Sequence, residues 1–298
     1  MTMNRRSFLA WSLTAAAALM TSHRPLSAAE PSIAKSPRLR FASRLYFVRG
    51  DLSQQLAWIE KQGFESIELN GNPVQMHAAW KQAFAHSSLI PSALNWNSLE
   101  TIVAGTAQQR SASIDSLKAA IDTCGDLKIP NIVIVPPRLR PEFTLPEPTQ
   151  SFSIIRDVLG SLADRASQAG TCLMIEPVTP KDAQCINTVA DAVNLCTSIN
   201  KPGVAFVFDF CKMIQTEPDL AGAIERGAPF LRQVHLSSSK RTFPGQEKED
   251  VVKFRDGFRG LKKIGYNGFC CFECGNKENY QDKVGASMEF LRTQWDAA

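Results

Sequence analysis

The feature that most constrains the fold is a series of short apolar runs, each followed by a longer segment with helical periodicity. The runs NIVIVP (131–136), TCLMIEP (171–177) and VAFVFDF (204–210) are apolar almost throughout. Continuous apolar character is typical of parallel strands that are buried on both faces, because helices cover both sides of such a sheet. The chain is therefore expected to be an α/β protein built on a parallel sheet.

The number of these repeats narrows the fold further. Eight strands are predicted, at 40–47, 64–69, 91–96, 131–136, 171–177, 204–210, 232–238 and 268–274. Helices are predicted at 51–62, 74–84, 111–124, 151–169, after Asn187, and at 217–226, 250–264 and 278–295. Eight strand–helix repeats in about 260 residues predict a (β/α)8 TIM barrel. An open doubly wound sheet is the alternative, but it usually has fewer strands, and no glycine-rich phosphate loop follows any strand.

The first 29 residues are predicted to be a signal rather than part of the barrel. Paired arginines in NRRSFL precede an apolar run that ends near Met20, and small residues follow at 27–29. This pattern resembles a twin-arginine (Tat) export signal, with an ordinary secretory signal or a short anchor as the alternatives. We therefore expect a barrel domain at 30–298 that is exported to the periplasm, with no membrane attachment after signal removal.

Charge gives no reason to expect nucleic acid or an anionic membrane as a partner. The whole chain has 33 basic and 29 acidic residues, and removal of three arginines with the signal leaves 30 basic residues. A nearly neutral domain lacks the basic excess with which proteins hold polyanions.

The cysteines are expected to be small buried thiols, because several lie in apolar, strand-like runs. A soft-metal site at Cys270-Cys271-x-x-Cys274 is disfavoured, since adjacent residues on a strand point to opposite faces. A disulfide framework is unnecessary in a chain of this length.

Four potential metal ligands stand at the ends of the last four predicted strands. They are Glu176, Asp209, His235 and Glu273. Each alone could form a salt bridge or cap a helix, but a charged side chain in an apolar strand is costly unless it is paired or bound to a cation. Three carboxylates and one imidazole suit a single Mn, Mg, Co or Zn ion. The sequence therefore predicts one divalent metal in the opening of the barrel, where barrel enzymes carry their chemistry.

With these residues in place, the chain resembles the xylose isomerase-like barrels of sugar isomerases, ketose 3-epimerases and inosose dehydratases. The four acceptors are separated by 33, 26 and 38 residues, and the run GFESIEL resembles the family's second strand. The resemblance implies that the four hold the metal. It also implies substrate-binding roles for Glu68, Arg241 and Asp182, and a turn at Pro244-Gly245 after the arginine.

Three positions depart from the family pattern, and at one of them Asp182 stands where several epimerases carry glutamate. Lys212 replaces the histidine usually found three residues after the strand-six aspartate, and Thr179 replaces the asparagine usual after the strand-five glutamate. Lys212 is expected to donate a hydrogen bond to a substrate oxygen and to stabilise an anionic intermediate. The alternative is a solvated surface lysine. These changes leave the predicted metal ligands intact but put the substrate in question.

The predicted reaction is proton abstraction beside a carbonyl through an enediolate that a divalent metal stabilises. Glu176 and Glu273 are assigned as the acid/base pair, with Asp209 and His235 holding the metal. The sequence does not choose among epimerisation, isomerisation and dehydration. In each case the expected partner is a small sugar or cyclitol. An apurinic endonuclease is disfavoured because the chain has only four histidines. A non-catalytic exported carbohydrate-binding barrel remains the other class, and homo-oligomers are common among such barrels.

Overall fold

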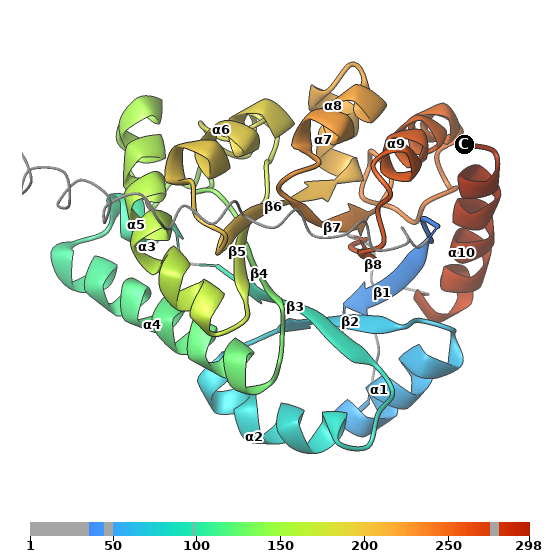
Figure 1. Cartoon of the computed structure of the whole chain (residues 1–298), viewed down its shortest axis with the longest axis horizontal. Coiled ribbons are helices and arrows are strands. Elements are labelled where there is room, and N and C mark those ends of the chain that lie inside the picture. The colour runs from blue at the N-terminus through green and yellow to red at the C-terminus, as the bar shows by residue number, and fades with distance from the viewer. Residues whose placement is uncertain (1–35, 45–49, 98, 275–279) are drawn as a thin grey trace, which may run out of the picture. The chain divides into compact units, whose positions relative to one another are not determined.

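Eight parallel strands close into a barrel in the computed structural model, which describes residues 36–44, 50–97, 99–274 and 280–298. The strands are β1 (Arg40–Arg44), β2 (Ser66–Asn70), β3 (Ile90–Trp96), β4 (Asn131–Ile134), β5 (Cys172–Ile175), β6 (Val204–Asp209), β7 (Leu231–Leu236) and β8 (Phe269–Phe272). Each strand pairs in parallel with its neighbours, and β1 pairs with β8 to complete the circle (Figure 1). The prediction of a TIM barrel is confirmed.

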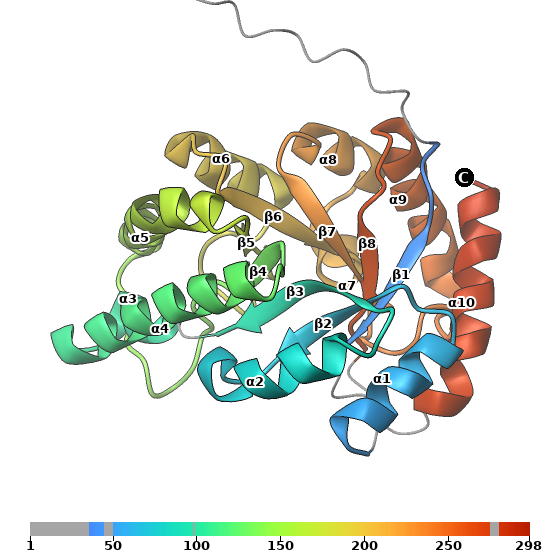
Figure 2. The same cartoon turned by 60° about the horizontal axis from the view of Figure 1, so that its bottom comes forward.

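Helices surround the barrel and connect successive strands (Figures 1 and 2). They are α1 (Leu52–Lys61), α2 (Pro73–Phe84), α3 (Leu99–Ala104), α4 (Ala107–Asp126), α5 (Pro148–Gln168), α6 (Val189–Ile199), α7 (Phe210–Thr216), α8 (Leu220–Gly227), α9 (Val251–Lys263) and α10 (Tyr280–Asp296). A 3-10 turn, η2 (Lys248–Asp250), precedes α9. None of the described helices is both long and apolar enough to cross a bilayer.

Two short helices were not predicted, and one of them changes a predicted strand end. The run 204–210 was expected to be strand throughout, but Phe210 begins α7. The Asp209 carboxylate accepts a hydrogen bond from the Cys211 backbone amide and so caps that helix. The other unpredicted helix, α3, lies in the connection after β3. The predicted strand residues 45–47 and the predicted signal at 1–29 lie outside the described residues.

The barrel wall separates two apolar layers because side chains alternate along each strand. Inside the barrel lies a small cluster that includes Val133, Met174, Ala205 and Val207. The intervening residues, such as Ile175, belong to the larger core between the strands and the helices. Side chains of every second strand residue therefore point into the barrel interior, where they stack in layers.

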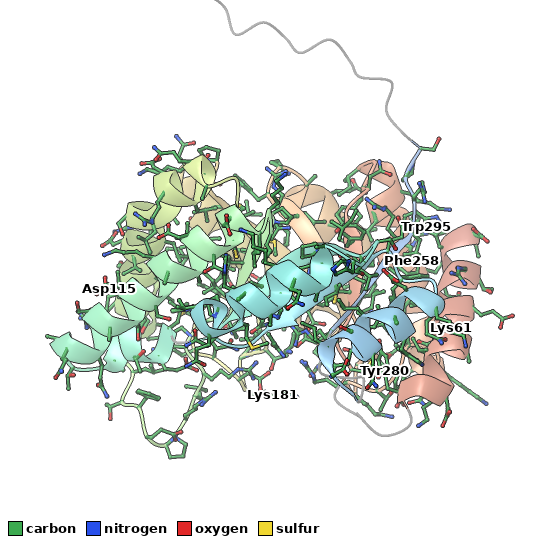
Figure 3. The ribbon with its side chains drawn as sticks, turned by 90° about the horizontal axis from the view of Figure 1, so that it is seen from below. Lys61, Asp115, Lys181, Phe258, Tyr280 and Trp295 are labelled. Carbon is green, nitrogen blue, oxygen red and sulfur yellow. The ribbon has the colours of Figure 1, made fainter. Side chains whose placement is uncertain are left out.

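Aromatic rings fill the space between the last helices and the barrel wall. The rings of Phe210 and Phe254 are stacked with centroids 4.8 Å apart, and Phe258 meets Trp295 edge to face at 5.4 Å. Figure 3 shows Phe258 and Trp295 beside each other between α9 and α10. This packing fixes α7, α9 and α10 on the side of the barrel that carries the last strands.

All eight cysteines are free and buried, so the prediction of small buried thiols is confirmed. Burial raises their pKa, to about 12 for Cys124 and about 11 for Cys211.

Candidate metal centre

The alternation of side chains explains why four acceptors meet at one end of the barrel. Met174 and Val207 point into the barrel interior. Two residues further along each strand direction come Glu176 and Asp209, which therefore also point inward, one layer nearer the opening. His235 and Glu273 hold the corresponding inward positions on β7 and just after β8, beside the outward-facing Leu236 and Phe272.

The four acceptors converge as expected from the sequence. One ligand atom from each of Glu176, Asp209, His235 and Glu273 lies within 4.8 Å of the others, and all four residues are buried. The geometry brings together three carboxylates and one imidazole from four consecutive strands. This donor set is one that Zn²⁺, Mn²⁺ or Mg²⁺ accepts.

His235 is oriented by a carboxylate beneath it. Its Nε2 lies 2.8 Å from Glu68 Oε2, while its Nδ1 lies 3.1 Å from Glu176 Oε1 and 2.7 Å from Glu273 Oε2. The Gln233 amide also donates to Glu68 Oε2 at 2.6 Å. Nδ1 is therefore the nitrogen that faces the acceptor cluster, and Glu68 occupies the supporting position that carboxylates commonly take behind metal-binding histidines.

Two arginines contact the carboxylates of this cluster. Arg44 contacts Glu68 and Glu273 at 2.6 and 2.8 Å. Arg241 Nη2 donates to Glu273 Oε1 at 2.6 Å, and its Nη1 lies 3.8 Å from Asp209 Oδ2. These contacts place both arginines at the edge of the acceptor cluster.

Lys212 lies inside this network rather than on the surface. Its side chain is only 4% exposed, and Nζ donates to Asp209 Oδ2 at 3.2 Å. The alternative of a solvated surface lysine is therefore wrong. The remaining Asp209 oxygen, Oδ1, is committed to the cap of α7.

Burial and charge pull the pKa values of the site in opposite directions. Burial alone lowers the pKa of His235, but the Glu68, Glu273 and Glu176 carboxylates outweigh it and raise that pKa well above its usual value. Burial alone raises the pKa of Glu273, yet Arg44, His235 and Arg241 hold it well below the usual range. The pKa of Lys212 is raised, because Asp209, Glu176 and Glu273 outweigh the effect of burial. In all three groups the neighbouring charges outweigh burial and favour the charged form.

A divalent metal fits the residues that are present. Glu273 Oε2 is buried and accepts no hydrogen bond among the described residues, although it lies 2.7 Å from His235 Nδ1. A buried acceptor of this kind needs a partner. Four carboxylates, those of Glu68, Glu176, Asp209 and Glu273, face three permanent cations. These groups together leave one net negative charge. A divalent ion would change this to one net positive charge, and it would replace the proton of His235.

The remaining predicted substrate residues fall into two groups. Arg241 and Lys212 line a cavity at the same opening, with Asp182 on its wall. Arg241 has a backbone φ of 58°, which is unusual for a residue other than glycine, and its turn is held by a bond from its amide to the Ser238 carbonyl. The Glu68 side chain has no exposed surface, so the contacts that the structure gives it are with His235, Arg44 and Gln233. A substrate contact by Glu68 stays a prediction.

Sequence reasoning missed some members of the site. Arg44, at the end of β1, pairs with Glu273 across the closure between β1 and β8, which are far apart in the chain. Its one signal was a charged residue at the end of an apolar strand, the same signal that marked the acids. Arg138 and Lys181, which also line the cavity, stand in connecting loops without a local pattern.

The cavity beside the cluster has a volume of about 540 Å³. It is formed by the connections that follow β4, β5, β6 and β7, at the carboxyl ends of the strands. Its wall carries five basic residues and one acid, which are Arg138, Lys181, Lys212, Lys240, Arg241 and Asp182. We call it the cationic cavity.

Comparison with solved structures finds the same fold. The chain matches 3-keto-D-glucoside 4-epimerase (YcjR) from E. coli with a TM-score of 0.75 at 21% identity, covering 86% of this chain and 100% of that one. It matches a structure of the IOLI protein with a bound zinc atom with a TM-score of 0.69 at 20% identity, covering 86% and 96% of the two chains.

Among curated proteins, the relatives are sugar epimerases. A ketose 3-epimerase from Arthrobacter globiformis is 25% identical over 184 residues, which are 62% of this chain and 63% of that protein. The match thus spans less than two thirds of the ketose 3-epimerase. The 3-dehydro-D-guloside 4-epimerase of Escherichia coli (strain K12) is 22% identical over 257 residues, or 83% of this chain and 96% of its own length.

A family model covers most of the chain. The model described as the xylose isomerase-like TIM barrel matches residues 56–294, a range that contains all four acceptors of the candidate metal centre. The chain therefore belongs to the xylose isomerase-like TIM barrel family.

Proposed function

We propose that this protein is a sugar epimerase or isomerase that depends on one divalent metal and moves a proton beside a carbonyl group. The observation that carries the proposal is the convergence of Glu176, Asp209, His235 and Glu273 within 4.8 Å at the opening of the barrel. The sugar epimerases among its relatives support the reaction class, and the zinc atom in the IOLI protein structure supports the metal.

When bound, the metal would supply positive charge to the oxygens of an enediolate, which makes the neighbouring C–H bond more acidic. The protein's own residues do the rest. Glu68 fixes the ring of His235, and the cap on α7 fixes Asp209. These two ligands are thereby held in position before substrate binds, which lowers the cost of assembling the site.

Glu176 and Glu273 are the proposed acid and base. They directly follow β5 and β8, which are not neighbours in the barrel, and we therefore propose that they approach a bound sugar from different sides. Arg44 and Arg241 both bind Glu273 Oε1 and keep this carboxylate ionised, as a base must be. Proton return to the opposite face gives an epimer, return to the neighbouring carbon gives an isomer, and loss of a β-hydroxyl gives dehydration.

Lys212 and Arg241 are proposed to bind substrate oxygens. Both line the cationic cavity, and both already contact carboxylates of the cluster. An ammonium and a guanidinium at this border would stabilise negative charge that develops on the substrate. Lys212 is also the observation that favours a second candidate function, a barrel that binds sugar without turnover, because its ammonium occupies a position where the family usually has histidine.

Solvent deuterium exchange separates the two functions. The metal-loaded protein is expected to exchange carbon-bound hydrogen of a ketose or inosose substrate with the solvent, as observed by NMR. Glu176→Gln and Glu273→Gln should each slow exchange by at least about a hundredfold, a typical acid–base contribution. Glu289→Gln on the exposed side of α10 is the matched control and should leave the rate unchanged. Undiminished exchange in both active-site variants would exclude the assignment, and binding without any exchange would favour the non-catalytic barrel.

We also propose that the barrel domain at 30–298 is exported by the Tat pathway to the periplasm, on the basis of the NRRSFL segment.

A further inference from the structure

The walls of the cationic cavity carry more positive charge than the metal centre uses. Lys212 and Arg241 are paired with Asp209 and Glu273. Lys240 is paired with Glu247 and Glu249, at 2.7 and 3.2 Å. Those three cations are therefore committed to carboxylates of the protein.

Within the part of the chain that the structure describes, the other two basic residues have no carboxylate partner. Lys181 Nζ donates to the neutral Gln215 side-chain oxygen at 3.1 Å. The guanidinium of Arg138 forms no ion pair with a carboxylate among the described residues; only its backbone amide reaches Glu100, at 3.3 Å. Two cations on one cavity wall thus retain their charge for a ligand.

The structure also holds these two residues together. Arg138 and Ala183 form an antiparallel bridge, and the Leu139 amide donates to the Asp182 carbonyl at 2.8 Å. The connections after β4 and β5 are thereby joined edge to edge. Figure 3 shows Lys181 among the loops at the lower edge of the barrel, away from Asp115 on α4. The pair is therefore part of a built wall rather than two independent surface side chains.

One acid opposes this charge. Asp182 lines the same cavity, and its Oδ2 accepts a hydrogen bond from the Thr179 hydroxyl at 2.6 Å. It makes no ion pair with Arg138 or Lys181, so it reduces the positive potential of the wall without occupying either cation. The wall remains positive.

We propose that the substrate carries an acidic group, a carboxylate or a phosphate, which Arg138 and Lys181 bind while its carbonyl end reaches the metal centre. This inference rests on the proposed function. A cavity of about 540 Å³ has the size of an ordinary small-ligand pocket. Guanidinium and ammonium groups recognise carboxylate and phosphate oxygens by charge-assisted hydrogen bonds. A neutral ketose would leave both cations without a counter-charge.

Binding is tested first, without turnover. Calorimetric titrations use D-glucuronate, D-glucose and inorganic phosphate with the full barrel domain and with its Glu176→Gln variant. D-glucuronate or phosphate is expected to bind at least about tenfold more tightly than D-glucose, and the difference should shrink at high salt. The better of the two anions identifies the acidic group. Equal affinity for D-glucose and both anions would overturn the proposal.

Variants then locate the site. Arg138→Gln with Lys181→Gln is expected to weaken anion binding at least about tenfold, as loss of charge-assisted bonds predicts, with little effect on D-glucose. The control, Arg156→Gln with Lys118→Gln, removes two exposed charges from α5 and α4 and should change nothing. Unchanged anion affinity in the first double variant would overturn the assignment to these residues.

Deuterium exchange keeps this inference separate from the proposed function. The value of kcat/KM for exchange is expected to be higher with D-fructuronate or D-fructose 6-phosphate than with D-fructose. The Arg138/Lys181 double variant is expected to have a higher KM for the acidic sugar. If no sugar exchanges while anions still bind, the proposed function fails and the anion site stands. If D-fructose exchanges as well as the acidic sugars and the double variant behaves like wild type, the anion site fails and the proposed function stands.

Discussion

At the scale of single residues, the fold fixes the orientation of the proposed metal-binding side chain of His235. His235 has no exposed side-chain surface, and its two ring nitrogens face different carboxylates. Nε2 meets Glu68 beneath the ring, which leaves Nδ1 for the acceptor cluster. A ring held in this way pays little conformational entropy when a metal binds.

The first prediction concerns the residue behind the ring. Glu68→Gln should weaken divalent metal binding by about ten- to a hundredfold, the usual effect of losing a partner of a ligating histidine. All four acceptors remain in place, so the loss would report on orientation. Glu65→Gln, which removes a partly exposed acid just before the same strand, is the matched control. Metal titrations on the two variants decide the matter; equal affinities would show that Glu68 does not position His235.

The second prediction concerns pH. Because the carboxylates raise the pKa of His235 well above its usual value, we expect the ring to carry a proton at pH 7 in the metal-free protein. A raised pKa stabilises the folded state below the unfolded pKa of about 6.5, and this stabilisation disappears as the pH rises through the folded pKa. A metal must displace this proton, so about one proton should be released per metal bound at pH 7.

Calorimetry in two buffers with different ionisation enthalpies measures that release. Metal affinity should rise with pH until His235 loses its proton in the free protein. A heat of binding that is independent of the buffer would contradict the account.

At this scale the sequence predicted the four acceptors well and their partners poorly. Glu176, Asp209, His235 and Glu273 each stand at the end of an apolar strand, and a strand's direction and alternation fix where its last residue points. The partner Arg44 is 229 positions away from Glu273, and only closure of the barrel brings the two together. Local patterns carry no signal for such a contact.

At the scale of helices and strands, a glycine sets how closely α5 packs against the barrel wall. Gly203 lies just before β6, where a Cβ atom would collide with the backbone oxygen of Ala163 in α5. Its carbonyl also accepts a hydrogen bond from Leu173 in β5 at 2.9 Å. This glycine stands directly before the predicted strand 204–210, but the close approach of α5 depends on packing that periodicity does not describe.

The third prediction compares two glycines. Gly203→Ala should lower the free energy of unfolding by about 2 kcal/mol or more, because backbone rather than a flexible side chain blocks the new methyl group. Gly285→Ala in α10 has open space around it among the described residues and should stabilise the protein by about 0.5–1 kcal/mol. Urea unfolding measures both. A neutral Gly203→Ala would show that α5 shifts freely against the barrel.

Element boundaries show where apolar pattern alone fails. The predicted strand 204–210 was one residue too long because Phe210 is as apolar as the strand before it. The chain turns there because Asp209 caps α7. The capping side chain also belongs to the candidate metal centre, so one carboxylate sets both the end of a strand and the chemistry beside it.

The whole molecule combines a closed barrel with a leader that we propose directs its export. All eight strand positions were predicted, because each buried parallel strand leaves its own apolar run. The two helices that were not predicted, α3 and α7, lie in connections after strands and are too short to show helical periodicity. Eight free, buried cysteines fit a protein that folds before export and needs no disulfide.

The fourth prediction tests that route. Replacement of Arg5 and Arg6 by lysine should abolish accumulation of the full-length chain in the periplasm of a Tat-competent bacterium, since the Tat signal depends on the paired arginines. Cell fractionation followed by immunoblotting measures it, with Arg24→Lys as the control outside the pair. Export of the lysine variant at the level of the wild type would assign the leader to the ordinary secretory route.

The most direct test of the central claim is anomalous diffraction from crystals of the barrel domain grown with Mn²⁺. The account predicts a single anomalous peak within about 2.0–2.6 Å of Glu176, Asp209, His235 and Glu273, the range of metal–oxygen and metal–nitrogen bonds. The contrary result is the absence of a peak at saturating Mn²⁺, with Lys212 and Arg241 still bound to Asp209 and Glu273. In that case the protein's own cations, and no metal, would balance the four acceptors.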